Sequence, residues 1–340
     1  MWWNRLCARS YRLFVWTSHD RRHFSAMTIR LLLGPQRPVT NLGSAMDAAG
    51  LPPGHVAVIA AGWQEAESDI DDVATAADRD VVNLGLYRRA EEVFAAAPDL
   101  HAAYRLRQDR LQELQRLYTL RLRQSMAAAR QMLRASGDAT LVAPEQRHAI
   151  AQLRALDRHH LQRLRTLHAE FDAAFDVRSN ALLAAHAAEI TARLAEVECV
   201  VLTGGNVAVL LNRLHLFGVG PLLASKHLVG WSAGAMALTE RVVLYHDNAP
   251  QGRRNPEIFG HGLGLVRQHV LLPDAKHRLK AGDRIRLALF SRRFAPAACV
   301  TLDSGSVLRL DGDRLGEIAD VRQIGASGRV RRAKNVVKKV

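Results

Sequence analysis

A serine held between two glycines is the first feature of this sequence that could do chemistry. The segment HLVGWSAGAMAL (227–238) places Ser232 between Gly230 and Gly234, after a short apolar run and before an alanine-rich run. On a sharp strand–turn–helix such a serine is exposed as a nucleophile, and the glycines let the helix start close to the strand. Short turns of small residues also serve only for packing, so the motif alone leaves both interpretations open.

A catalytic role for Ser232 sets requirements for the rest of the site. The positive end of the following helix would favour the oxyanion that develops during acyl transfer. The hydroxyl also needs a general base, and the base needs a group that orients it. In an open α/β sheet these groups are expected at the carboxyl ends of the strands.

Strand-like runs occur on both sides of a long helical region. TIRLLLG (28–34) and HVAVIAAG (55–62) precede it, with a helix-compatible stretch between them. After it, ECVVLTGG (198–205) runs into a Gly-Gly turn and a helix, and KHLVG leads to the serine turn. Continuous apolar strands alternating with helices predict a mostly parallel sheet covered by helices. Further strand-like runs, the last ones antiparallel, are 240–247, 262–272, 298–312 and 314–324.

The region between about residues 86 and 198 has helical periodicity and almost no Pro or Gly. The break at 135–146, with Gly137 and Pro144, reads as the turn between two long helices, which predicts an antiparallel hairpin like a two-stranded coiled coil. We expect this hairpin to be inserted after the second or third strand. Its apolar positions recur at spacings near three, four and seven: Leu100, Tyr104, Leu111, Leu114, Tyr118, Leu122 and Met126, then Ile150, Leu153, Leu164, Leu167, Phe171 and Phe175.

The histidines of the hairpin lack acidic or cysteine partners at ligand spacing, so we interpret them as packing or solvated side chains rather than a metal site. The mixed charge of the exposed face predicts a solvated surface, and docking of a partner or a homodimer through the hairpin stays open. These histidines are His148, His159, His160, His168 and His186.

The net charge of +14 is concentrated at the two ends. Residues 1–26 carry five Arg and one Asp, and residues 329–340 carry six basic residues and no acid. We therefore expect one α/β domain at 27–328, an extension at 1–26 that is disordered or not translated, and a disordered basic tail at 329–340. The nearly balanced body argues against specific nucleic-acid binding, with non-specific polyanion contact by the tail as the alternative.

Localisation follows from two further observations. No run of about 18 apolar residues is present, so we expect no membrane span. The three cysteines, Cys7, Cys199 and Cys299, are far apart and form no CxxC pair, which indicates a reducing compartment and a cytoplasmic protein.

The sequence resembles the serine peptidase family that contains α-aspartyl dipeptidase (dipeptidase E) and cyanophycinase. The similarity rests on LTGGN (202–206), on VGWSAGA (229–235) about 25 residues later, and on GLGLVRQH (262–269). It covers roughly residues 198–310, with weaker support from 28–62. The resemblance implies the class I glutamine amidotransferase-like fold, a flavodoxin-like three-layer sandwich with a mostly parallel central sheet, to which the helical hairpin is an addition.

The same resemblance implies roles for individual residues. Asp247 follows Ser232 by 15 residues and His269 follows Asp247 by 22, which are the intervals of the dipeptidase's Ser, Asp and His. Ser232 would be the nucleophile, His269 the general base and Asp247 the orienting carboxylate. The backbone N–H groups of Gly205 and Ala233 would form the oxyanion hole.

Two further residues are expected to bind substrate. They are Asn206, in LTGGN, and Arg278, which could grip a carboxylate through its guanidinium. Arg284 and Arg286 lie nearby in the same charge run, AKHRLKAGDRIR (275–286), which could equally be a solvated surface.

Alternatives to this assignment remain. Asp247 and His269 could be a turn residue and a strand-end residue, and His246 is a less favoured base because it breaks the spacing. The cyanophycinase branch would place its acid at Ser304, with Asp303 next to it on the other face of a strand.

The predicted activity is a serine-type peptidase acting on a small peptide or isopeptide, such as an aspartyl dipeptide, without a metal or organic cofactor. The alternative is a non-catalytic amidotransferase-like module that binds a partner through its hairpin. A glutaminase is disfavoured because the turn carries Ser232 instead of cysteine. A larger α/β-hydrolase is disfavoured because its three catalytic residues normally spread over more of the chain.

Overall fold

The central sheet of the protein is mostly parallel, as predicted. The computed structural model describes residues 28–175, 179–247, 255–312 and 314–333. Within these residues the largest sheet has seven strands in the order β11-β10-β1-β5-β4-β2-β3, of which the last five are parallel. These strands are β1 (Ile29–Leu33), β2 (Val56–Ile59), β3 (Val81–Asn83), β4 (Cys199–Leu202), β5 (His227–Trp231) and the antiparallel β10 (Val307–Asp311) and β11 (Arg314–Ala319).

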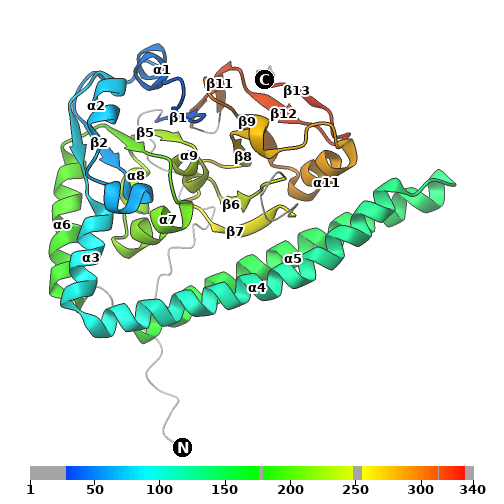
Figure 1. The fold of residues 1–340 in the computed structure, drawn as a ribbon, viewed down its shortest axis with the longest axis horizontal. Coiled ribbons are helices and arrows are strands. Elements are labelled where there is room, and N and C mark those ends of the chain that lie inside the picture. Colours follow the sequence, from blue (N-terminus) through cyan, green and yellow to red (C-terminus); the bar gives the residue numbers. More distant parts are fainter. Residues whose placement is uncertain (1–27, 176–178, 248–254, 313, 334–340) are drawn as a thin grey trace, which may run out of the picture.

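Helices cover both faces of this sheet because its strands are apolar on both sides. Leu31 and Leu33 of β1 pack into one core and Leu32 into the other, as the two-residue period of a strand requires. The first core contains α1 (Leu42–Ala48) and α2 (Asp71–Ala77). The second contains α3 (Leu86–Ala96), α7 (Val207–Leu216) and α9 (Ala233–Leu238). The expected three-layer arrangement is confirmed (Figure 1).

A second, four-stranded sheet has the order β13-β12-β9-β8. The parallel strands β8 (His269–Pro273) and β9 (Ala298–Leu302) are extended by the antiparallel β12 (Arg322–Ile324) and β13 (Val330–Arg332). Residues 330–332 were expected in a disordered tail, and this part of the prediction is wrong because they pair with β12 along the sheet edge. Residues 334–340 and 1–27 lie outside the described residues.

The remaining elements connect the two sheets. An antiparallel ribbon is formed by β6 (Arg241–Leu244) and β7 (Glu257–His261). Two helices, α10 (Ala275–Arg278) and α11 (Arg284–Phe294), follow β8. The short helices η1 (Ala61–Ala66) and α8 (Gly220–Leu223) complete the fold.

The inserted region follows β3, and its described residues form four α-helices instead of two. The two long helices are α4 (Pro98–Arg134) and α5 (Ala139–Ala174), which form the predicted hairpin (Figure 1). The helices α3 and α6 (Ala181–Ala195) are separate from it, and α3 ends at Ala96 because Ala97 precedes a proline, and such a residue disfavours helical backbone. Among the described residues, no helix combines the length and the apolar character that crossing a membrane requires.

The turn of the hairpin is shorter than predicted. Asp138 is the N-cap of α5 and accepts a hydrogen bond from the backbone nitrogen of Thr140 at 2.8 Å. Pro144, which was expected in the turn, therefore lies inside α5.

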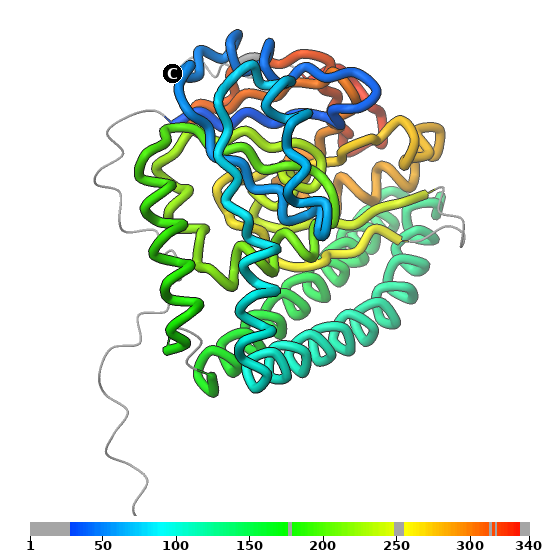
Figure 2. Tube along the Cα trace, turned by 60° about the vertical axis from the view of Figure 1, so that its left-hand side comes forward, coloured from blue at the N-terminus to red at the C-terminus, as the bar shows by residue number. Residues whose placement is uncertain are grey.

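The hairpin packs on α11 and on β7 of the ribbon, and lies below the ribbon in Figure 2. Its apolar contacts include Tyr118 of α4 and Leu153 of α5, which share a core with Phe294 of α11. Within that contact the buried guanidinium of Arg293 lies 2.7 Å from both carboxylate oxygens of Asp157 and 2.6 Å from the Tyr118 hydroxyl. A buried, bidentate ion pair thus joins both hairpin helices to α11.

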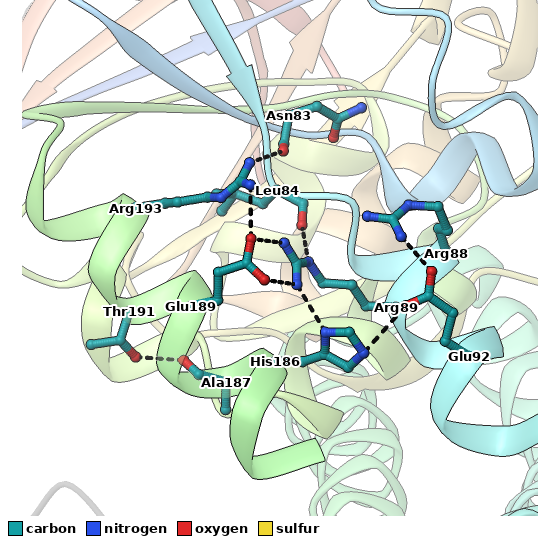
Figure 3. A network of polar contacts seen from close by, with 10 residues as sticks. All are labelled: Asn83, Leu84, Arg88, Arg89, Glu92, His186, Ala187, Glu189, Thr191 and Arg193. Atoms are coloured by element: carbon teal, nitrogen blue, oxygen red, sulfur yellow. Dashed lines mark hydrogen bonds and ion pairs between the residues drawn. The ribbon is translucent and has the colours of Figure 1, made fainter. Parts of the chain in front are cut away.

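A second polar network joins α3 to α6 beside β3 (Figure 3). Arg89 of α3 is 3% exposed and donates two hydrogen bonds, of 2.6 and 2.7 Å, to the carboxylate of Glu189 on α6. The guanidinium of Arg193 contacts the same carboxylate at 2.7 Å, and Nε of Arg89 donates to the carbonyl of Leu84. These contacts fix the ends of the insertion next to the edge of the central sheet.

His160 stacks on Tyr118, which is a hydrogen-bond partner of Arg293, and its burial leads us to predict how the stability of the protein changes with pH. His160 is 3% exposed, stacks on the Tyr118 ring at 4.0 Å, and contacts Gln115 through Nε2 at 3.0 Å. Burial lowers the pKa of His160 from 6.5 to about 4. Because the unfolded chain binds this proton more readily, the free energy of unfolding should decrease as pH falls from about 6.5 towards 4, by on the order of 2 kcal/mol for this group.

Urea denaturation between pH 7 and pH 4.5 tests this effect in two neighbouring variants. His160→Gln should reduce the pH dependence of stability, because the buried titrating group is gone. His159→Gln is the matched control, since His159 is exposed and should leave the dependence as in the wild type. An equal pH dependence in both variants would show that His160 is not the titrating group.

Candidate active site

Ser232 adopts a strained backbone conformation at the turn between β5 and α9. Its φ is 49° and its ψ is −114°, a region that residues with a side chain rarely occupy. The flanking glycines are required by close backbone contacts. A Cβ at Gly234 would lie 2.1 Å from the carbonyl oxygen of Leu202, and one at Gly230 would lie 3.0 Å from the nitrogen of Ala235. The turn has the sharp geometry that the nucleophile interpretation requires, with a half-buried serine.

A cavity of about 690 Å³ opens in front of this turn. Its walls come from the turn after β4, the ends of β5 and β8, the start of α7, the β6–β7 ribbon and α10. The polar residues that matter for chemistry here are Ser232, His246, Asp274, His277 and Arg278. The cavity therefore lies at the carboxyl ends of the strands, as expected for an α/β sheet.

The two predicted oxyanion-hole residues, Gly205 and Ala233, both line this cavity. Gly205 has a φ of 104°, and a Cβ there would lie 2.4 Å from the carbonyl oxygen of Gly62. The preceding Gly204 packs against the serine, because a Cβ on it would lie 3.3 Å from the Ser232 Cβ. The Gly-Gly turn thus needs glycine at Gly205, and a small residue at Gly204 lets it approach the nucleophile.

The predicted substrate-binding residues lie in different environments. The side chain of Asn206 caps α7, accepting hydrogen bonds from the backbone nitrogens of Ala208 at 3.0 Å and Val209 at 3.2 Å. Asn206 therefore supports the Gly-Gly turn, and it does not line the cavity. Arg278 does line it, with a half-exposed side chain whose Nε lies 3.5 Å from the Asp274 carboxylate.

The structure does not bring His269 to Ser232. His269 is the first residue of β8, and its Nδ1 donates to the carbonyl of Arg267 at 2.7 Å. Pro273, at the other end of this strand, is the residue that lines the cavity, about 13 Å further along. The prediction of His269 from its spacing to Ser232 and Asp247 is not met, because the strand begins at the histidine and carries it away from the nucleophile.

The position of Asp247 also does not allow it to orient the predicted base. Its side chain is fully buried, forms an ion pair with Arg286 of α11, and accepts a hydrogen bond from the backbone nitrogen of Lys280 at 3.2 Å. Its own backbone nitrogen donates to the carbonyl of Arg278 at 2.7 Å. Asp247 therefore holds the segment around α10, and it contacts neither His269 nor Ser232.

Two cavity residues were missed by the sequence reasoning. Asp274 and His277 lie three residues apart at α10, with Nδ1 of His277 2.5 Å from Oδ1 of Asp274. They stand in PDAKHR (273–278), directly after a predicted strand, and this position was the available signal. His246, the less favoured base, also lines the cavity, and its buried Nδ1 has no hydrogen-bond partner among the described residues.

Asp303 and Ser304 lie beside this segment. The carboxylate of Asp303 accepts a hydrogen bond from the backbone nitrogen of Lys276 at 2.8 Å, at the start of α10. In the described part of the chain, no group of three His, Cys, Asp or Glu side chains is arranged to hold a metal ion.

Comparisons with known proteins bear on the family. The sequence model of peptidase family S51 matches residues 151–318. A solved peptidase from an acI-B1 Actinobacterium is 11% identical, with 88% of this chain and 91% of that chain covered and a TM-score of 0.41. A candidate Peptidase E protein from Listeria monocytogenes EGD-e is 20% identical, with 43% and 65% covered and a TM-score of 0.27. No curated protein sequence matches.

The matched range contains the Ser232 turn, the β6–β7 ribbon and α10, and so most of the cavity. It also agrees with the resemblance seen in the GWSAGA turn. Similarity to this family supports the interpretation of this protein as a peptidase. Residues 151–318 of this chain are therefore similar to peptidase family S51.

Proposed function

We propose that this protein is a serine-type peptidase that cleaves a small peptide or isopeptide bond through an acyl-enzyme on Ser232. The observation that carries the proposal is the strained turn that presents Ser232 to the cavity, next to Gly205 and Ala233. Nucleophile and oxyanion donors must both lie about 3 Å from one reacting carbonyl group, and a shared cavity wall is consistent with this.

The reaction would proceed in two steps. The Ser232 hydroxyl oxygen attacks the carbonyl carbon while a histidine of the cavity takes its proton, and the backbone N–H groups of Gly205 and Ala233 stabilise the oxyanion. Collapse of this intermediate breaks the C–N bond, and the histidine returns the proton to the leaving amine. Water then hydrolyses the ester with the same histidine as base. Neither a metal nor an organic cofactor is required for these steps.

The size and charge of the cavity support a small substrate that carries a carboxylate. A volume of about 690 Å³ is in the range of small-molecule sites. Arg37 and Arg278 are both in its wall, where a guanidinium could bind a carboxylate. Arg37 also contacts Asp72 at 2.8 Å, so substrate would compete with that exposed pair. An aspartyl dipeptide or a β-aspartyl peptide fits these features.

A second function is favoured by one observation on the hairpin. Leu106, Leu117 and Leu120 lie on α4 with exposed fractions of 55%, 44% and 54%. An exposed row of leucines suits a protein-binding module, in which the cavity would have no catalytic role.

Intact-mass labelling with a fluorophosphonate tests the proposal and separates the two functions. We expect one adduct on the wild type and none on Ser232→Ala, because only an activated serine reacts. Aspartyl dipeptides and β-aspartyl peptides would then be tested as substrates. Folded wild-type protein without an adduct would reject the peptidase and favour the binding module.

A further inference from the structure

We infer that His277, oriented by Asp274, is the general base that serves Ser232. This inference rests on the proposed peptidase function and assigns the proton-transfer group that the spacing-based prediction had placed at His269. It is carried by the direction of β8, by the contact between the two side chains, and by the hydrogen bonds that hold α10.

The direction of β8 decides which of its ends faces the nucleophile. The backbone nitrogen of Gln268, just before the strand, donates to the side chain of Glu240, which lies beyond the carboxyl end of α9. Ser232 immediately precedes the opposite end of that helix. The start of β8 is therefore remote from Ser232, and the residues that follow its last residue, Pro273, reach the cavity.

The contact between His277 and Asp274 has the form of a base and its orienter. A carboxylate can only accept here, so Oδ1 of Asp274 at 2.5 Å fixes the proton on Nδ1 of His277 and puts the imidazole lone pair on Nε2. The negative charge also stabilises the imidazolium that forms when Nε2 takes the serine proton. Both residues line the same cavity as Ser232.

Backbone hydrogen bonds fix the segment that carries the pair. The nitrogen of Asp274 donates to the carbonyl of Leu302 at 3.0 Å, and the nitrogen of Lys276 donates to Asp303 at 2.8 Å. The Tyr245 hydroxyl donates to the carbonyl of Pro273. Asp247 holds the other end of α10 through its contacts with Arg278 and Lys280. Two of the acids considered as triad members, Asp247 and Asp303, are thus supports for the histidine's helix.

Two features distinguish His277 from the other cavity histidine, His246. No carboxylate among the described residues contacts the ring of His246, whereas Asp274 contacts His277 directly. The side chain of His277 is also 82% exposed, so its replacement should not disturb the core, and a small base from solution can reach the vacated position.

The test is the rate of fluorophosphonate labelling of Ser232, measured from pH 5 to pH 9. His277→Ala should label about 10²–10⁴-fold more slowly than the wild type, and added imidazole should restore much of the rate. Asp274→Asn should label slowly, because the amide no longer fixes the proton on Nδ1 of His277, and Asp274→Glu, which keeps a carboxylate, should recover part of the rate. His269→Ala is the matched control and should label like the wild type.

Each remaining outcome has a distinct meaning. Wild-type labelling of His277→Ala, or an imidazole-insensitive loss, would overturn the assignment of His277. A loss confined to His246→Ala would move the base to that residue and also overturn it. Equal labelling rates of Asp274→Asn and Asp274→Glu would reject the positioning role of Asp274. Absence of labelling in the wild type would instead reject the proposed function itself. Thermal melts of all variants confirm that each is folded.

Discussion

Replacing Ser232 with glycine is expected to abolish hydrolysis and at the same time to make the folded protein more stable than Ser232→Ala. Both variants lose the nucleophile, and we expect each to lower kcat by at least about 10⁴-fold. They differ in backbone strain. At φ 49° and ψ −114° a residue with a Cβ stores on the order of 1–3 kcal/mol, and only glycine relieves it.

Urea denaturation of the two variants measures that difference directly. Glycine has more freedom in the unfolded chain, which costs about 0.5–1 kcal/mol, so the net advantage of Ser232→Gly over Ser232→Ala should be about 1–2 kcal/mol. Ser44 is a suitable control, because it is exposed on α1, where glycine is the poorer residue. There Ser44→Gly should be less stable than Ser44→Ala. The same order at both positions would contradict a strained nucleophile turn.

Replacing Asp157 with alanine is expected to lower the free energy of unfolding by about 3–5 kcal/mol. The substitution leaves the guanidinium of Arg293, which is 2% exposed, without its carboxylate partner. It also removes the acceptor of the Tyr118 hydroxyl, at 2.8 Å. The cost is large because a buried charge without a partner has lost its hydration and gained nothing in return.

Two further variants test whether the loss of stability in Asp157→Ala comes from breaking the buried ion pair. Glu113→Ala breaks an exposed ion pair with Arg116 on the same hairpin and should change the free energy of unfolding far less than Asp157→Ala does. The double variant Asp157→Leu/Arg293→Met replaces the buried charges by apolar side chains and should be more stable than Asp157→Ala. Equal losses for Asp157→Ala and Glu113→Ala would show that the buried pair does not anchor the hairpin.

The sequence was informative wherever local chemistry decides the structure. Runs such as TIRLLLG are apolar on both faces, and such a strand is stable only between two layers of helices, as β1 is. The hairpin followed from its helical periodicity. Its turn is shorter than the sequence predicts, because the cap at Asp138 starts α5 before Pro144.

The sequence was sufficient to predict the turn that carries the nucleophile, Ser232, but it was not sufficient to predict the position of His269, the expected general base. Gly230, Ser232 and Gly234 act within five consecutive residues, so their geometry is contained in the motif. The position of His269 depends on where β8 begins, and β8 begins there because it pairs with β9, about thirty residues later. A shift of a few residues in a strand boundary moves a side chain to the other end of a strand.

The two ion pairs that anchor α11 determine whether the hairpin can be removed from this protein. Arg286 pairs with Asp247 beside the cavity, and Arg293, two helical turns later, pairs with Asp157 of the hairpin. A shortened chain without residues 98–174 would leave a buried cation and the ring of Phe294 facing water on this same helix. The hairpin is therefore not a detachable module, and its removal is expected to damage the region around α10 as well.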